Sequence, residues 1–248
     1  MKISVVTAVW NSEATVRDAI ASVATQTYTD IEHVVVEGKS KDGSLAAIEN
    51  ASHERMRLIS EPDDGIYDAL NKGIRNATGD VVGFVHSDDF LAHNGVLARI
   101  AAAFADPAVE AVFSDLVYVS QVNTSLVIRH WSTGAFHPRR LKYGWMPAHP
   151  TLYLRREVYE RFGAYDKNMR IAADYDFVLR YFSQTTSKSV YIPEVLYKMR
   201  VGGVSNRNWA KIRQKMKEDM LAIRRNRVGG LHTLALKNLS KVGQFLVR

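Results

Sequence analysis

The 248-residue sequence contains no cysteine. It therefore has no disulfide bond, no thiolate metal site and no cysteine nucleophile, which is consistent with a reducing compartment such as the cytoplasm. No stretch approaches the roughly 18 consecutive apolar residues that a membrane-spanning helix needs. Because 46% of the residues are hydrophobic, the chain can still bury a sizeable core, and the composition indicates a soluble globular protein.

Two glycine-rich phosphate-binding motifs are also missing. A dinucleotide-binding fold carries G-x-G-x-x-G directly after its first strand, whereas the first glycine of this chain is Gly38. The P-loop pattern G-x-x-x-x-G-K-[ST] is absent as well. A phosphate-containing ligand would therefore have to be held by side chains and a metal ion.

Acidic residues are scarce at one end of the chain. Of the 33 basic and 26 acidic residues, eleven basic and only two acidic ones lie in residues 207–248. The formal net charge of +7 therefore belongs to this tail. Nucleic-acid-binding proteins more often mix basic and aromatic residues over the body of a domain, and none of their standard motifs is present. We expect no nucleic-acid partner.

Strand-like apolar runs alternate with helix-like segments in the first part of the chain. The strand-like runs are 2–10, 31–37, 56–60, 80–85 and 110–113, and the helix-like segments lie near 12–26, 44–53, 65–77 and 93–105. This order predicts an α/β fold with a mostly parallel sheet covered by helices on both faces. After about residue 120 the regularity fails, except for a helix-like run at 172–183, and we expect this half to pack on the sheet.

Polar residues follow several of the predicted strands. Asn11 follows the first, Glu37 ends the second, Glu61–Asp64 follow the third and His86–Asp89 follow the fourth. The carboxyl ends of parallel strands meet at one edge of a sheet, where ligands bind. Carboxylates gathered there repel one another unless a cation offsets them, and the absence of cysteine favours Mg²⁺ or Mn²⁺ holding phosphate oxygens.

Several segments together resemble one family, the inverting glycosyltransferases of family 2 with the GT-A fold, of the bacterial surface-polysaccharide type. The resemblance spans about residues 1–206 and is carried, in order, by SVVTAVWNSEATVRDAIASVATQTYTDIEHVVVEGKSKDGS, DDGIYDALNKGIRNATGDVVGFVHSDD, HPTLYLRREVYERFGAYD and ADYDFVLR. It implies a GT-A-like domain at 1–206, with a nucleotide-sugar half at about 1–115 and an acceptor half at about 116–206. Residues 207–248 would form a basic amphipathic helical tail.

The resemblance implies that one sugar passes, with inversion, from a nucleotide-diphospho-sugar to a hydroxyl group. A UDP-sugar is favoured as donor, with GDP or dTDP possible, and the acceptor is a saccharide or a polyprenyl-linked glycan. The chain lacks the Q-x-x-R-W motif, which argues against a processive synthase. Two other functions stay open: a glycoside hydrolase with two carboxylates, and a sugar-binding or membrane-surface module that has lost catalysis.

Asp88 resembles the metal-binding carboxylate of the family's D-x-D-type element. His86 stands where the first Asp of that element usually lies, and Glu37 stands where an Asp commonly contacts the nucleotide base. His86 either ligates the metal ion through imidazole or hydrogen-bonds nearby. These departures from the family pattern affect the metal and base preferences most directly.

Asp174 resembles the catalytic base that removes the proton of the acceptor hydroxyl. In the family this acid often follows Glu, and here it follows Ala173. An inverting transfer needs a single carboxylate opposite the leaving diphosphate. The alternative is that Asp174 only caps a helix. Asp176, two residues further on, would point elsewhere.

Further site residues are assigned mainly by the resemblance. The predicted nucleotide-sugar-binding residues are Thr7, Val9, Asn11, Glu37, Asp42, Asp64, Asn71, Lys72, Ser87, Asp88 and Arg200. Asp42 and Asp64 can equally be turn residues, and Asn71 and Lys72 a helix end. Arg200 precedes Gly202–Ser205, a segment able to close on phosphates.

Two residues between prolines, Trp145 and His149, are predicted to bind the acceptor, with structural packing as the alternative.

The basic tail contains two amphipathic stripes. The first is Trp209, Ile212, Met216, Met220 and Ile223, and the second is Leu231, Leu234, Ala235, Leu239, Val242 and Leu246. Such helices either lie on an anionic membrane or pack on the domain. Membrane contact would place the protein in the cytoplasm, peripheral on the inner face of the cell membrane.

Overall fold

A nine-stranded mixed sheet forms the centre of the protein in a computed structural model that describes residues 1–201 and 209–243. The strands are β1 (Ile3–Val9), β2 (Ile31–Glu37), β3 (Met56–Ser60), β4 (Val81–Phe84), β5 (Phe90–Leu91), β6 (Val109–Val119), β7 (Val127–Trp131), β8 (Tyr153–Arg155) and β9 (Lys188–Arg200). Their order is β3-β2-β1-β4-β8-β6-β9-β5, and β7 pairs with β6.

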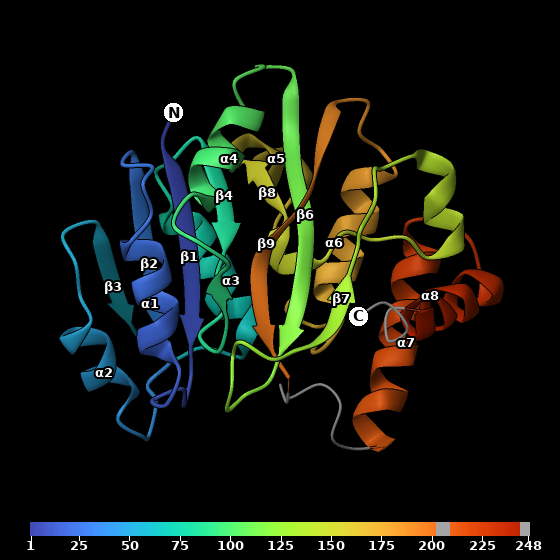
Figure 1. The fold of residues 1–248 in the computed structure, drawn as a ribbon. Coiled ribbons are helices and arrows are strands. Elements are labelled where there is room, and N and C mark those ends of the chain that lie inside the picture. The colour runs from blue at the N-terminus through green and yellow to red at the C-terminus, as the bar shows by residue number, and fades with distance from the viewer. Residues whose placement is uncertain (202–208, 244–248) are drawn as a thin grey trace.

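Helices cover both faces of this sheet, as Figure 1 shows. They are α1 (Val16–Ala24), α2 (Ser44–Asn50), α3 (Ile66–Asn76), α4 (Val96–Ala103), α5 (Arg156–Phe162), α6 (Ala173–Phe182), α7 (Trp209–Arg225) and α8 (Leu231–Gly243), with 3-10 turns η1 (Pro138–Tyr143) and η2 (His149–Thr151). The expected strands and helices of the first half are all present, with shifted ends.

Alternation along β1 explains the two covered faces. Ile3 and Val5 pack in a core with α1 and α4, whereas Val6 and Ala8 pack in a second core with α3, α5 and α6. Successive strand residues point to opposite faces, so every residue of β1 is buried. Gly73 lets α3 approach this strand closely, because a Cβ at that position would lie 2.1 Å from Val6 Cγ1.

The second half of the chain does more than pack on the sheet, and the expectation falls short here. Its strands β8 and β9 join the same sheet on either side of β6, with β8 antiparallel to β4 and β6 and β9 parallel to β6. Six strands therefore point one way, and β5, β7 and β8 point the other way. The sequence does not predict the long β9, because Pro193 interrupts its strand pattern. Pro193 lies where the register between β9 and β6 shifts.

The tail completes the core. Helix α7 packs on α6, and α8 packs on α7 and η1. Ala222, Ile223, Val228 and Leu234 are buried in the α6 core. Ile223 of the first stripe and Leu234 of the second therefore pack on the domain, as the packing alternative expects.

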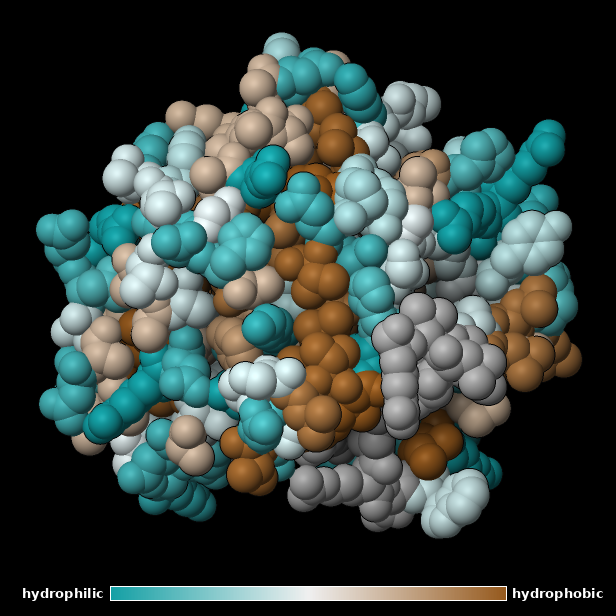
Figure 2. Space-filling model, in the orientation of Figure 1, coloured by the Kyte–Doolittle hydropathy of each residue, from teal (hydrophilic) through white to brown (hydrophobic). Residues whose placement is uncertain are grey.

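Part of each stripe remains exposed. Trp209 is 86% and Leu231 74% exposed, and Ile212, Met216 and Leu239 are exposed as well. Brown atoms in Figure 2 mark apolar surface beside the position of α8 in Figure 1. Val242 and Leu246 lie outside the residues whose side chains are described. None of the described helices is long and apolar enough to span a membrane.

Candidate active site

The loops after the parallel strands meet at one edge of the sheet, toward which the arrowheads of β1, β6 and β9 point in Figure 1. Several of the loops touch one another directly. Ser12 Oγ lies 2.9 Å from Ser87 Oγ, which joins the loop after β1 to the loop after β4. A Cβ on Gly38 would lie 2.2 Å from Asp63 Oδ2, so the loop after β2 lies directly against the Asp63 side chain of the loop after β3.

The loop after β2 is held by Asn11 and Asp42. Asn11, which has a positive φ of 49°, accepts a hydrogen bond from the Lys41 amide through Oδ1 at 2.9 Å. Asp42 accepts from the Ser44 amide at 3.0 Å and from the Glu13 amide at 3.2 Å. Asp42 thus stabilises the first turn of α2, as the turn interpretation expects.

Glu37 lies buried beneath this loop. It accepts hydrogen bonds from the Ser40 amide at 2.5 Å and from Ser60 Oγ at 2.6 Å. Burial opposes ionisation, but the hydrogen bonds from Ser60 and Ser40 outweigh it and lower the pKa of Glu37. Thr7 and Val9 are buried in β1, and Thr7 Oγ1 lies 2.9 Å from Nε2 of the buried His33.

Strand β9 fixes the loop after β4. Asp89 is fully buried and accepts from the Arg200 amide at 2.9 Å and from the Tyr197 hydroxyl at 3.3 Å. Burial, reinforced by the Asp88 charge, raises the pKa of Asp89 well above its ordinary value. Arg200 donates to the Asp88 carbonyl at 2.8 Å, pairs with Asp18 and is only 7% exposed. Its guanidinium therefore already has partners in the protein.

Asp174 joins this loop from a distant part of the chain. The charges of both Asp88 and Asp174 act on His86, and the His86 ring stacks on His149 with centroids 5.7 Å apart. Burial lowers the pKa of His86 despite these carboxylates, and it lowers that of His149 to about 4. Both imidazoles are therefore neutral near pH 7. The predicted metal-binding and catalytic residues thus gather in one place.

The hydrogen bonds of Asp174 argue against a capping role. Helix α6 begins at Ala173 after the N-cap residue Ala172, so Asp174 is the second residue of the helix. Its Oδ1 accepts from the Tyr67 hydroxyl at 3.1 Å. Burial and the Asp174 charge raise the pKa of Tyr67 well above its ordinary value, so this hydroxyl remains a donor.

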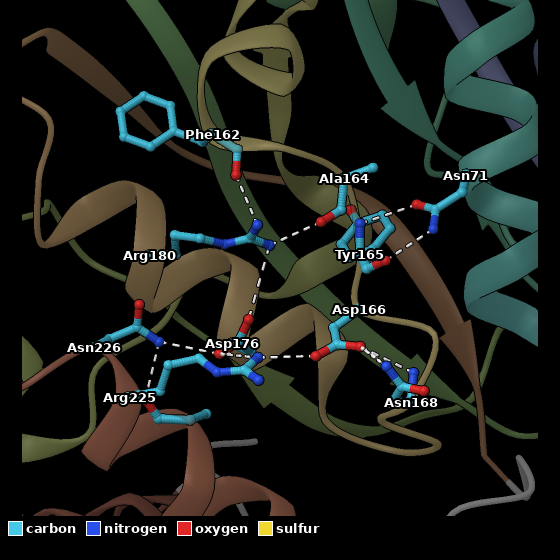
Figure 3. A network of polar contacts seen from close by, with 11 residues as sticks. Asn71, Phe162, Ala164, Tyr165, Asp166, Asn168, Asp176, Arg180, Arg225 and Asn226 are labelled. Carbon is cyan, nitrogen blue, oxygen red and sulfur yellow. Dashed lines mark hydrogen bonds and ion pairs between the residues drawn. The ribbon is translucent and has the colours of Figure 1, made fainter.

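Asp176 serves a different purpose, shown in Figure 3. It is buried and accepts from Asn226 Nδ2 at 3.1 Å, with Arg180 and Arg225 within 4 Å. Arg180 also donates to the carbonyls of Phe162 and Ala164. Asp176 therefore anchors α6 to the tail, which agrees with its being a weaker candidate for the base than Asp174.

The remaining predicted residues lie around this centre. Asn71 exchanges two hydrogen bonds with the backbone of Tyr165, at 2.8 and 2.9 Å (Figure 3). Lys72 binds the Pro62 carbonyl and Glu61, while the Asp64 side chain is largely exposed. The Lys72 contacts hold the loop between β3 and α3, and the Asn71 contacts join α3 to the segment at Tyr165.

The two predicted acceptor-binding residues are buried. His149 is 7% exposed, and its Nε2 lies 2.7 Å from the Tyr165 hydroxyl. Trp145 is 8% exposed and donates from Nε1 to the Thr133 carbonyl at 3.0 Å. Trp145 also packs on Phe113 and Phe182, which favours the packing alternative. The His149 ring stacks on His86 and lies close enough to Asp174 for the Asp174 charge to act on it.

Sequence reasoning missed Tyr67 and Glu218 as residues around the base. Tyr67 lies inside the segment DDGIYDALNKG, in which only polar residues are predicted to bind the nucleotide-sugar. Glu218 is one of the two acidic residues in the basic tail, and that scarcity was the available signal.

The described residues offer only part of a metal site. No three His, Asp or Glu side chains within them lie close enough to hold an ion alone. Two donors are nevertheless free: the Asp88 carboxylate forms no hydrogen bond or ion pair with any described residue, and the buried Nδ1 of His86 has no partner there either. This pair fits an ion whose other ligands come from a diphosphate and water.

Comparison with known proteins finds both a family model and curated relatives that match this chain. A model of glycosyl transferase family 2 matches residues 4–163. A PGL/p-HBAD biosynthesis glycosyltransferase of Mycobacterium tuberculosis is 33% identical over 207 residues, covering 82% of this chain and 78% of that protein. The O-antigen biosynthesis protein RfbC of Myxococcus xanthus is 32% identical over 218 residues, covering 82% of this chain and 16% of that protein.

Solved structures share the fold. S. aureus TarS 1-349 in complex with UDP-GlcNAc has a TM-score of 0.70 and 18% identity, covering 90% of this chain and 66% of that chain. The mannosyltransferase PcManGT from Pyrobaculum calidifontis, in complex with GDP-Man and Mn²⁺, has a TM-score of 0.67 and 19% identity, covering 98% and 69%. These likenesses agree with the GT-A fold expected from the sequence.

Proposed function

The chain belongs to glycosyl transferase family 2, and from that membership we propose that it transfers one sugar, with inversion, from a nucleotide-diphospho-sugar to a hydroxyl acceptor. The observation that carries the proposal is that Asp174 and Asp88 both lie close enough to His86 for their charges to act on its ring. Family membership gives no support to the hydrolase alternative.

The proposed reaction uses Asp174 as the base. Its carboxylate accepts the proton of the acceptor hydroxyl while that oxygen forms a bond to the anomeric carbon of the sugar. The bond from this carbon to the diphosphate oxygen breaks on the opposite side, and the nucleoside diphosphate leaves. Tyr67 orients the carboxylate by donating to Oδ1, which leaves the other oxygen for the acceptor.

Asp88 and His86 would hold a divalent ion, Mg²⁺ or Mn²⁺. Such an ion neutralises the charge that develops on the leaving diphosphate. The neutral state of His86, which follows from its lowered pKa, suits imidazole ligation. The mannosyltransferase neighbour is described with Mn²⁺, which supports the proposal by analogy.

The donor is proposed to be a UDP-sugar, with GDP-sugars and dTDP-sugars as the alternatives. The solved neighbours are described with UDP-GlcNAc and GDP-Man. Glu37, Asp42 and Asn11 border the loop that would receive the nucleotide. The names of the curated relatives support a polysaccharide or lipid-linked glycan as acceptor.

Contact with a membrane surface is proposed for the exposed part of the tail. Trp209, Ile212 and Met216 on α7 and Leu231 and Leu239 on α8 are apolar and exposed. The tail is also basic, which suits anionic lipids. Co-sedimentation with vesicles containing phosphatidylglycerol tests this contact. Equal sedimentation of wild type and a Leu231→Ser, Leu239→Ser variant would contradict it for α8.

A donor screen tests the proposed function. UDP-, GDP- and dTDP-sugars are added with and without Mn²⁺, and unfolding temperature and release of nucleoside diphosphate are measured. A true donor stabilises the folded state and is turned over when an acceptor is present. The anomeric configuration of the product, read by NMR, must be opposite to that of the donor. Retention of configuration would contradict the proposed mechanism.

A further inference from the structure

Glu218 on α7 binds the backbone directly before the helix that carries Asp174. Its Oε2 accepts from the amides of Ile171 at 2.8 Å and Ala172 at 2.9 Å, and its Oε1 accepts from the Arg170 amide at 3.1 Å. One carboxylate thus binds three successive amides. Ala172 is the N-cap residue of α6 and supplies no side-chain cap, so Glu218 satisfies the Ala172 amide, which the helix leaves free, together with the two amides before it.

The Tyr67 hydroxyl links the Ile171 peptide, which Glu218 binds, to the Asp174 carboxylate. The Tyr67 hydroxyl lies 2.8 Å from the Ile171 carbonyl and 3.1 Å from Asp174 Oδ1, so its single proton is shared between the two acceptors. The negative charge of Glu218 also acts on Tyr67. Movement of the Ile171 peptide would therefore change the hydrogen bond that orients Asp174.

The partners of Glu218 set it apart from the neighbouring acid. Within the described ranges, no Lys or Arg lies within 4 Å of its carboxylate, which is balanced by amides and by Gln214 Nε2 at 2.9 Å. Asp219 is fully buried and pairs with Lys215 at 2.6 Å and with Lys237 at 2.7 Å. Asp219 joins the two tail helices, whereas Glu218 reaches out of the tail to the site.

We propose that Glu218 is a positioning residue for the catalytic base, so that the tail takes part in catalysis without touching the substrate. This inference rests on the proposed role of Asp174. Glu218 holds residues 170–172 in place, these residues place Tyr67 against Asp174, and the carboxylate of Asp174 then faces the acceptor. The donor is bound by the loops after β1, β2 and β4, which Glu218 does not contact.

Substitutions of two adjacent residues distinguish a role in positioning Asp174 from a role in the stability of the fold. Glu218→Gln removes the charge and turns an amide group toward backbone donors, so at least one of the three hydrogen bonds is lost. Asp219→Asn makes the same chemical change one residue further on, in the ion pairs between α7 and α8. Lys217→Gln, which changes an exposed residue of the same turn, is the control that keeps wild-type behaviour.

Glu218→Gln is expected to lower kcat by roughly 10- to 100-fold, as small displacements of a catalytic group do, with donor affinity within about twofold of wild type. Asp219→Asn is expected to lower the unfolding temperature while the folded protein keeps near-normal kcat. Hydrogen exchange at residues 170–172 should accelerate in Glu218→Gln only. If Glu218→Gln does not fold, Glu218→Asp, which keeps the charge at shorter reach, must show the same selective loss of kcat.

Wild-type kcat in Glu218→Gln, or an equal loss of kcat in the folded Asp219→Asn protein, would overturn the proposal. If the wild-type protein turns over no nucleotide sugar, the proposed function fails instead, and the exchange experiment still decides whether Glu218 holds residues 170–172.

Discussion

The loops after β1 and β2, where the nucleotide-sugar is proposed to bind and which we call the donor edge, differ from the proposed base Asp174 in how far apart in sequence their contacts lie. Asn11 and Lys41, which shape the donor edge, are 30 residues apart, and Asp42 and Ser44 are two residues apart. Tyr67 and Asp174 are 107 residues apart, and Glu218 binds Ile171 from the tail. The loops after β1 and β2 therefore follow from neighbouring strand-helix units, whereas the loop after β4, which carries Asp88, depends on Arg200 at the end of β9. The contacts of the proposed base combine the first half, α6 and the tail.

Removal of the tail after residue 206 is the largest change that tests this comparison. The truncation exposes the α6 core that Ile223, Val228 and Leu234 cover. Each buried side chain of this size contributes about 1.5–3 kcal/mol, a large share of the 5–15 kcal/mol typical of a whole protein. We expect an insoluble or unfolded product by circular dichroism and thermal melting. A folded, donor-binding truncated protein would show that the tail is an independent appendage.

Asp88→Asn should act on the donor side alone. Loss of one ligand charge is expected to weaken Mn²⁺-dependent donor affinity by at least about tenfold while the unfolding temperature stays near wild type. Calorimetric titration of the donor with and without Mn²⁺ measures this effect. Asp106→Asn, in an exposed ion pair with Lys188 away from the site, is the control. Unchanged Mn²⁺-dependent affinity would remove Asp88 from the proposed metal site.

A further prediction concerns pH and the buried His149, whose ring stacks on His86. Burial lowers the pKa of His149 to about 4, so between about pH 6.5 and 4 the unfolded chain binds a proton that the folded protein does not. The free energy of unfolding therefore falls as the pH drops through this window, by up to about 3 kcal/mol from this residue. His33, whose pKa burial lowers to about 3, adds to the same trend.

His149→Gln keeps a hydrogen-bonding partner for Tyr165 but does not titrate. The difference in unfolding free energy between pH 7 and pH 4.5, measured with urea, should shrink in this variant. His232→Gln, at an exposed position, should leave the difference unchanged. An equal pH dependence in wild type and His149→Gln would contradict the buried neutral state of His149.

The same contrast explains what could be predicted from the sequence. Continuous apolar runs such as Ile3–Val9 are buried on both faces, and the polar residues that follow them reveal the donor edge. Strand β8 has only three residues, and β9 contains a proline, so neither gives a clear periodic pattern. The gathering of Asp174, His86 and His149 depends on packing between distant segments, and the resemblance alone indicated it.

The tail shows the limit of amphipathic patterns most clearly. Its stripes predict that one side of each helix is covered, but not by what. The structure covers Ile223 and Leu234 with protein and leaves Trp209 and Leu231 exposed. The two acidic residues indicate how the tail helices are placed. Glu218 binds the Ile171 amide, and Asp219 pairs with Lys237 on α8.

The most direct test of the central claim is one measurement of both kcat and donor affinity on Asp174→Asn. Asparagine keeps the size of the side chain and an acceptor for Tyr67, but it cannot take the proton of the acceptor hydroxyl. We expect donor affinity close to wild type and a kcat reduced by roughly 10²–10⁴. Near-normal kcat in this variant would contradict the assignment of Asp174 as the base.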